Sequence, residues 1–279
     1  ALLSKGDHPD LLLMTATPIP RTLAMTAFGD MDVSTIREMP PGRKPVKTHL
    51  ARIGNEEKVY SFVDRELAKG NRAYFVYPRI EASGEGAPSI SDAATELKDV
   101  TTMREALTAR FPEVAVEMIH SRLEEEEKAR IMDAFATGDL RILVATSVVE
   151  VGVDIPDATA IVIEHAERFG LAALHQLRGR VGRSERRSYC FLVYSEPLTD
   201  VGKERLRTMH TTSDGFLIAE EDLRLRGPGE LEGVRQSGYL RLQVADLARD
   251  MELMLDAREA AVALAQEDPG LLAQGHREL

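Results

Sequence analysis

Short apolar segments alternate with segments of helical periodicity through the middle of the chain. The pattern predicts strands over residues 46–53, 73–77, 114–119, 141–149, 159–164 and 189–193. The segments 141–149 and 159–164 are almost continuously apolar, which is typical of strands covered on both faces. Because strands that alternate with helices form parallel sheets, we expect an α/β domain with a parallel sheet and helices on both faces.

Helical patterns lie between the predicted strands. One helix is expected from Glu56 to Lys69, with Gly70 as its stop. Its apolar face consists of Val59, Phe62, Val63 and Leu67. Another helix opens at 121–124, where Ser121 and Glu124 have the spacing of a capping box, and runs to about Ala136. Open sheets of this class carry their functional residues on loops at the carboxyl ends of the strands, so we expect the site there.

Two changes of composition divide the chain. The proline-rich segment 39–45 predicts a stiff connection, so residues 1–45 are expected to be the end of a preceding domain and a linker. Residues 46–198 form the α/β domain. Residues 199–279 lose the alternation and are expected to hold a helical hairpin and C-terminal helices, among them a helix at 243–266. Its apolar stripe consists of Leu247, Met251, Met254, Leu255, Val262 and Ala265.

Charge and composition narrow the class of protein. A formal charge of −11 argues against binding of nucleic acid by bulk attraction, although a local basic cluster can still provide it. The single cysteine, Cys190, cannot form an internal disulfide and lies in an apolar run. No long apolar span or signal pattern is present, so we expect a cytoplasmic protein without a membrane partner. Because the chain begins with Ala1 and reaches an apolar segment almost at once, we expect a piece of a longer protein.

The segment with the most specific chemistry is 175–183, His-Gln-Leu-Arg-Gly-Arg-Val-Gly-Arg. Arg180 and Arg183 each follow a glycine, and their spacing predicts that both lie on one side of a helical turn. A guanidinium stays charged and forks onto phosphate oxygens. The segment resembles the Gln-x-x-Gly-Arg-x-Gly-Arg motif of the second large helicase superfamily. That resemblance implies that Arg180 and Arg183 are catalytic arginine fingers and that Gln176 and Gly179 bind the nucleotide.

Upstream, the segment 143–156 resembles motif V of the same superfamily. A predicted strand ends at Thr146, and the resemblance implies that its hydroxyl and the adjacent N–H groups hold a nucleic-acid phosphate. Gly152 permits a tight turn that aims Asp154 toward the nucleotide. The segment lies about 22 residues before Gln176, a spacing that favours the functional interpretation over an ordinary turn.

Two further segments resemble motifs of this superfamily. Ile119-His120-Ser121-Arg122 resembles a strand-end motif that touches DNA, and the helix that follows offers free N–H groups to a phosphate. Met14-Thr15-Ala16-Thr17 resembles the Thr-Ala-Thr motif, which implies that Thr15 and Thr17 link hydrolysis to DNA binding. The chain has no Gly-x-x-x-x-Gly-Lys-[Ser/Thr] and no Asp-Glu-x-His segment, so nothing in it is expected to hold the β- and γ-phosphates or Mg²⁺.

Residues 219–238 point to one helicase family. They interleave arginine and glycine and resemble the translocation motif shared by RecG and the transcription-repair coupling factor. Arg-Leu-Arg-Gly-Pro-Gly-Glu-Leu, Val-Arg-Gln-Ser-Gly and the linker Pro-Pro-Gly-Arg-Lys-Pro-Val resemble RecG more closely, with Glu232 as a departure. By this resemblance the residues that couple hydrolysis to movement include Arg224, Arg226, Gly229, Arg235, Gln236 and Gly238.

The RecG resemblance implies a RecA-like second motor domain followed by a translocation motif. The complete protein would be an ATP-dependent DNA helicase that remodels branched double-stranded DNA, such as stalled forks and Holliday junctions, in repair and recombination. ATP and Mg²⁺ would be bound mainly by the upstream motor domain. This motor domain and a wedge domain of the same chain are the expected protein partners, and a monomer is the expected state.

Two alternatives stay open at the level of the sequence. The chain could be the corresponding part of a transcription-repair coupling factor, which also engages RNA polymerase. It could also be a nucleic-acid-binding module without motor function, which would leave Arg180, Arg183 and Asp154 without a role.

Overall fold

The computed structural model describes residues 42–78, 101–120, 122–146, 154–226 and 251–270, together with Ser34, Ile36, Glu38 and Ala273. The chain divides into two compact units. The first contains Ala1–Thr17 and Ile36–Asp222, and the second contains Pro18–Thr35 and Leu223–Leu279. All the strands and the candidate site described below belong to the first unit.

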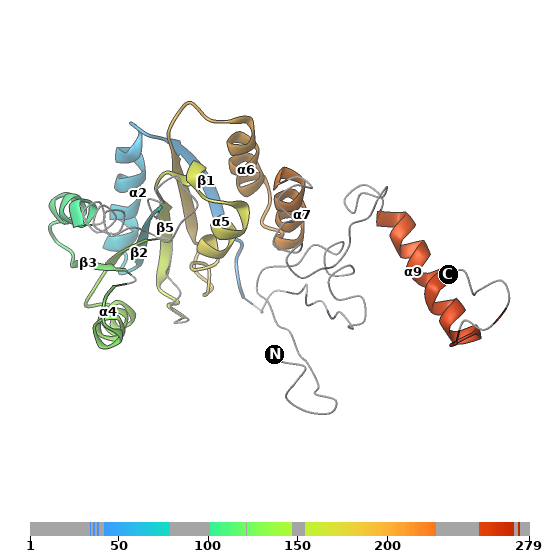
Figure 1. Cartoon of the computed structure of the whole chain (residues 1–279). Helices are drawn as coiled ribbons and strands as arrows, with labels where there is room; N and C mark the ends of the chain where they lie inside the picture. Colours follow the sequence, from blue (N-terminus) through green and yellow to red (C-terminus); the bar gives the residue numbers. More distant parts are fainter. Residues whose placement is uncertain are drawn as a thin grey trace. The chain divides into compact units, whose positions relative to one another are not determined.

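The centre of the first unit is a parallel sheet (Figure 1). Its strands are β1 (Lys47–Arg52), β2 (Arg72–Tyr77), β3 (Val116–Ile119), β4 (Ile142–Thr146), β5 (Ala158–Ile163) and β6 (Tyr189–Tyr194). They are ordered β1-β6-β5-β2-β4-β3, and each neighbouring pair is parallel. The parallel sheet and the positions of its strands confirm the pattern-based prediction.

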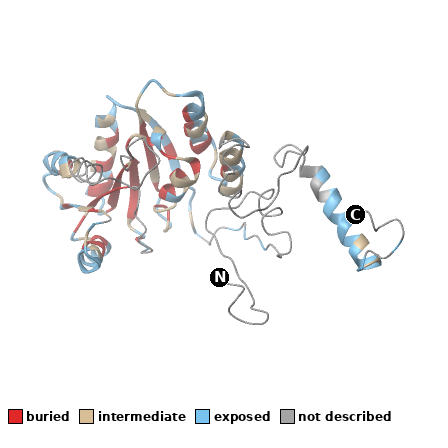
Figure 2. Cartoon of the chain, in the orientation of Figure 1, coloured by how far each residue is buried: buried red, intermediate tan, exposed pale blue. Residues whose placement is uncertain are grey.

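Burial along the strands follows their place in the sheet (Figure 2). Every residue of the central strands β2, β4 and β5 is buried, as expected for apolar runs covered on both faces. The edge strand β1 is largely exposed. In β6, Cys190 is fully buried, and burial raises the pKa of its thiol to about 12.

Helices cover both faces of the sheet (Figure 1). They are α2 (Glu56–Ala68), a helix at 101–110, α4 (Glu125–Thr137), α5 (Leu171–Arg178) and α6 (Asp200–Thr211), with a 3-10 turn η1 (Ala166–Arg168). On one face, Phe75 of β2 shares a core with Val63 of α2 and Leu107 of the 101–110 helix. On the other, the ring of Tyr74 lies 4.9 Å from that of Phe135 in α4. Because successive side chains of a strand point to opposite faces, the helices form two layers.

The helix predicted from Glu56 to Lys69 is confirmed as α2, with Lys69 as its C-cap residue. The predicted capping box is wrong. α4 begins at Glu125, and its N-cap residue Glu124 is extended and makes no side-chain cap hydrogen bond. The chain first makes a turn in which the N–H of Leu123 donates to the carbonyl of His120 over 3.3 Å. Glu124 therefore lies outside the helix. The acidic side chains in the first turn of α4 complement the positive end of the helix.

Helices follow the last strand, as predicted. α6 packs against β1, and α7 (Gly215–Arg226) comes next. In the second unit, α9 (Met251–Glu267) confirms the C-terminal part of the helix predicted at 243–266, whose first residues lie outside the described ones. Val262 on its predicted apolar stripe is exposed. None of the helices in the described residues is both long and apolar enough to span a bilayer.

Candidate functional site

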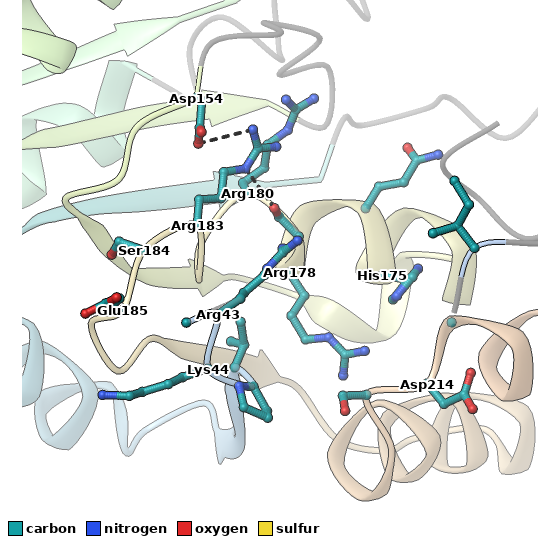
Figure 3. Close-up of a pocket in the computed structure, with 18 of the residues that line it drawn as sticks. Arg43, Lys44, Asp154, His175, Arg178, Arg180, Arg183, Ser184, Glu185 and Asp214 are labelled. Carbon is teal, nitrogen blue, oxygen red and sulfur yellow. Dashed lines mark hydrogen bonds and ion pairs between the residues drawn. The ribbon is translucent and has the colours of Figure 1, made fainter. Parts of the chain in front are cut away.

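A groove lies where the loop after α5 meets the linker before β1 (Figure 3). Among the described residues, its basic lining side chains are Arg43, Lys44, Arg178, Arg180 and Arg183. Its acidic lining side chains are Asp154, Glu185 and Asp214. Because positive groups outnumber negative ones and come from segments far apart in the sequence, the groove suits an anionic ligand.

The two arginines of the 175–183 motif lie on a loop, so the prediction that they share a helical turn is wrong. α5 ends at Arg178, and Gly182 has a φ of 75°, which a right-handed helix does not allow. Arg180 and Arg183 nevertheless both line the groove, and both are partly exposed. Both side chains therefore line the same groove, but from a loop and not from a helix.

Arg183 and Asp154, which come from two different motifs, lie next to each other in the groove. The Nη1 of Arg183 lies 3.5 Å from Oδ1 of Asp154, and its Nε donates to the carbonyl of Gly179 over 3.1 Å. Asp154 is 62% exposed, so this ion pair is screened by water and holds Arg183 only weakly. The arginine is oriented in the groove and remains available to a stronger anion. Gln176, on the exposed side of α5, lines the same groove.

Arg178 has a structural position that sequence analysis missed. It is buried, and its Nη1 donates to the carbonyls of Met209 over 3.0 Å and Thr212 over 2.8 Å. Burial lowers the pKa of its guanidinium. These carbonyls belong to the end of α6, where a helix has no internal partners for them. Arg178 thus ties the end of α5, just before the loop of Arg180, to α6.

The linker before β1 also belongs to the site, which sequence analysis did not predict. The Nε of Arg43 donates to the carbonyl of Gly182 over 2.8 Å. A Cβ atom at Gly182 would lie 2.6 Å from Cγ2 of Val46, so only glycine fits between the linker and the loop. The available signal was the pair of basic residues, Arg43 and Lys44, inside a proline-rich segment.

Two of the predicted DNA-binding residues share the carboxyl edge of the sheet. Ile119 of β3 pairs with Ala145 of β4, so His120 and Thr146, the next residues, lie at the same level. Thr146 is buried and His120 is partly buried, whereas Arg122 is exposed and its N–H donates to Nδ1 of His120 over 3.3 Å. The structure therefore brings His120 and Thr146 to neighbouring strand ends.

The same edge holds a buried carboxyl group that the motifs do not contain. Glu164 follows β5, is 5% exposed, and accepts a hydrogen bond from the hydroxyl of Tyr60 over 3.2 Å. Burial, with a smaller contribution from Glu56 and Glu167, raises the pKa of Glu164 to about 7. Nothing in the sequence pattern distinguished it, because a glutamate at a strand end is usually exposed.

Several predicted site residues lie outside the described ones. These are Thr15, Thr17, Ser121, Gly152, Gly229, Arg235, Gln236 and Gly238. Arg226 ends α7, but its side chain is not among those described, and Arg224 is exposed on the same helix. No group of three His, Cys, Asp or Glu side chains in the described part of the chain is placed to hold a metal ion.

Two family models match the chain. Residues 61–185 match the helicase conserved C-terminal domain, which covers most of the sheet and the Arg180–Arg183 loop. Residues 212–276 match the C-terminal part of domain 3 of the ATP-dependent DNA helicase RecG. The second match includes α7 and α9.

Whole-chain comparisons agree with these models. The chain is 54% identical over 269 residues to the ATP-dependent DNA helicase RecG of Treponema pallidum, and 54% identical over 258 residues to that of Borreliella burgdorferi. These alignments cover 95% and 92% of this chain, but only 38% and 36% of the relatives. A solved structure of RecG bound to a three-way DNA junction is 46% identical, with a TM-score of 0.69. That match covers 91% of this chain and 31% of the solved one.

Proposed function

This chain belongs to the RecG family of ATP-dependent DNA helicases, and on that premise we propose that it is the second motor lobe and translocation segment of such an enzyme. The chain spans about two fifths of the relatives' length, so the activity proposed is that of the complete protein. We retain the boundaries 1–45, 46–198 and 199–279 for the end of the first motor domain, the second motor domain and the translocation region. The RecG domain 3 match favours this family over a transcription-repair coupling factor.

The observation that carries the proposal is the convergence of Arg180, Arg183 and Asp154 on one cationic groove. In the complete enzyme ATP would bind between the two motor lobes, held mainly by the upstream lobe with Mg²⁺. ATP supplies the γ-phosphate whose cleavage drives movement. Arg180 and Arg183 would neutralise the charge that develops on this phosphate, and Gln176, Gly179, Gly152 and Asp154 would order the groove around it.

The substrate proposed for the complete protein is branched double-stranded DNA. Support comes from the relative that was solved bound to a three-way DNA junction. Within this chain, Thr146, His120, Ser121 and Arg122 would contact the DNA backbone at the carboxyl edge of the sheet. We propose that Thr15, Thr17, Arg224, Arg226, Gly229, Arg235, Gln236 and Gly238 couple hydrolysis to movement. The complete protein would act as a monomer with its own upstream motor and wedge domains.

Replacement of Arg183 by alanine in the complete protein tests the finger role. We expect DNA-stimulated ATP turnover to fall by about 10³-fold or more, because an arginine finger contributes that much to phosphoryl transfer. Binding of a forked DNA should stay within about twofold of wild type, because the groove does not include the DNA-binding edge. The matched control is Arg187→Ala, which removes an exposed arginine of the same loop. Unchanged turnover in the Arg183 variant would contradict the motor assignment and favour a non-catalytic DNA-binding module.

A further inference from the structure

Arg43 comes from the linker, yet its side chain reaches the loop of the two finger arginines. Its Nε donates to the carbonyl of Gly182 over 2.8 Å. Figure 3 shows the Arg43 side chain turned toward the loop that carries Arg180 and Arg183. Arg43 is partly buried and lines the groove with both finger arginines.

The backbone on both sides of Arg43 is fixed against the same loop. Gly42 adopts a φ of 80°, and a Cβ atom there would approach Oε1 of Glu185 to 2.9 Å. Val46 lies against Gly182, and the N–H of Lys47 donates to the carbonyl of Ser188 over 2.9 Å. The linker therefore runs alongside residues 182–188, and the position from which Arg43 extends is set before any ligand binds. A preorganised side chain binds with a smaller loss of conformational entropy.

Two other arginines that line the groove have their guanidinium groups engaged. Arg178 is buried and donates to two carbonyls, and Arg183 interacts with Gly179 and Asp154. For Arg43, Nε donates to Gly182, and within the described residues its two terminal nitrogens have no hydrogen-bond or ion-pair partner. These nitrogens carry four N–H donors in a planar fork, the geometry that matches two oxygens of a phosphate.

We propose that Arg43 is a third phosphate-binding arginine of the groove, which contacts the phosphates of the bound nucleotide beside Arg180 and Arg183. The inference rests on the proposed function, since it takes ATP as the ligand of this groove. Its ligand is an anion with at least two adjacent oxygens, because Nε is already occupied by Gly182 and only the terminal fork remains. Since Arg43 belongs to the segment that joins the two lobes, nucleotide binding would also hold the linker against the loop that carries Arg180 and Arg183.

Two substitutions separate phosphate binding from a purely structural role. Arg43→Gln places an amide N–H at the same number of bonds from the backbone as Nε, so it can still donate to Gly182 but has no terminal fork. Arg43→Met has a side chain of the same length as glutamine, but it has neither the donor to Gly182 nor the terminal fork. Lys47→Gln is the matched control, since it removes a nearby positive charge from an exposed side chain that does not line the groove. The variants are made in the complete protein, with thermal unfolding as a check on folding.

The measurements are the KM for ATP in DNA-stimulated hydrolysis and the Kd for a non-hydrolysable ATP analogue with Mg²⁺. We expect Arg43→Gln and Arg43→Met to raise both constants by about 10-fold or more, the loss typical of a charge-assisted hydrogen bond. Lys47→Gln should stay within about twofold of wild type. If Arg43→Gln leaves both constants at their wild-type values, the terminal nitrogens of Arg43 do not bind the nucleotide and the proposal is wrong. This conclusion does not depend on the result for Arg43→Met.

Binding of forked DNA without nucleotide is measured in parallel. A loss there in Arg43→Gln, with analogue binding unchanged, would assign the cation to DNA and overturn the proposal. Failure of the proposed function has a different signature, because the wild-type complete protein would then show no DNA-stimulated hydrolysis and no analogue binding. An active wild type with an unaffected Arg43→Gln variant rejects the present inference alone.

Discussion

Gly182 is a residue at which the linker lies directly against the loop that carries Arg180 and Arg183. Its φ of 75° lies in the left-handed region, and the methyl group of Val46 occupies the place where a side chain would begin. Both conditions exclude other residues, the first through backbone strain and the second through overlap. The glycine that precedes Arg183 in the motif is therefore required by the structure itself, whatever the role of Arg183.

Replacement of Gly182 by alanine should lower the free energy of unfolding by about 2–4 kcal/mol, because backbone strain adds to the overlap with Val46. Urea denaturation of this chain measures the loss. Gly54→Ala is the matched control, since Gly54 has a φ of 96° with nothing within 4 Å of a Cβ atom, and should cost about 1 kcal/mol. The double variant Gly182→Ala/Val46→Ala should recover part of the difference. Equal losses for the two glycines would show that the contact with Val46 has no energetic consequence.

Arg178, in the 175–183 motif, has a structural role, because it links the end of α5 to the end of α6. Replacement by methionine keeps most of the apolar stem but leaves the carbonyls of Met209 and Thr212 without their donor. We expect the free energy of unfolding to fall by about 2–4 kcal/mol, because one buried and one partly buried carbonyl would lose their donor. Arg207→Met, on the exposed side of α6, should change it by less than about 0.5 kcal/mol. A loss no larger than that of the control would mean that water replaces the guanidinium at these carbonyls.

The buried carboxyl group of Glu164, at the end of β5, should make stability depend on pH. Tyr60 of α2 donates to Glu164, whose pKa is raised from 4.5 to about 7, with burial as the largest cause. Because the folded-state pKa is above the unfolded one, the stability that Glu164 contributes is fully present below pH 4.5 and is lost as the pH rises through 7. The charged form is the one that burial opposes.

Glu164→Gln removes this titration while keeping an oxygen that accepts from Tyr60. Relative to wild type, the variant should gain up to about 3 kcal/mol of unfolding free energy between pH 4.5 and pH 8. Urea denaturation at several pH values measures the change, and Glu113→Gln, at an exposed position, serves as the control. A constant difference between the Glu164 variant and wild type across this range would contradict the raised pKa.

The elements themselves followed from periodicity, and their errors have local causes. α2 was predicted almost to the residue because its apolar face and its glycine stop are both encoded within the segment. The start of α4 was misplaced because a capping box and a turn have similar short-range spacing, and the turn at His120–Leu123 prevailed. Arg180 and Arg183 were placed on a helix because a spacing of three fits one, whereas the φ of Gly182 ends that possibility.

The molecule as a whole contributes one side of the proposed ATP site. Its groove has basic side chains, but the sequence has no phosphate-binding loop. We therefore expect this chain alone to hydrolyse no ATP above background, with or without forked DNA, while the complete protein does so under the same conditions. A coupled assay for ADP release measures both. Turnover by the isolated chain that disappears in its Arg183→Ala variant would show that this chain holds a complete catalytic site.

The amino-acid sequence was sufficient for the strand and helix alternation, the family and the chemical character of the arginine motif, because each is encoded in neighbouring residues. Only the tertiary structure decided the sheet order, which places β1 beside β6 and so lays the linker along the loop that carries Arg180 and Arg183. It also brought together Arg43 with Gly182, 139 positions away, and Tyr60 with Glu164, 104 positions away. Such contacts depend on how whole elements pack, and no local spacing in one sequence encodes them.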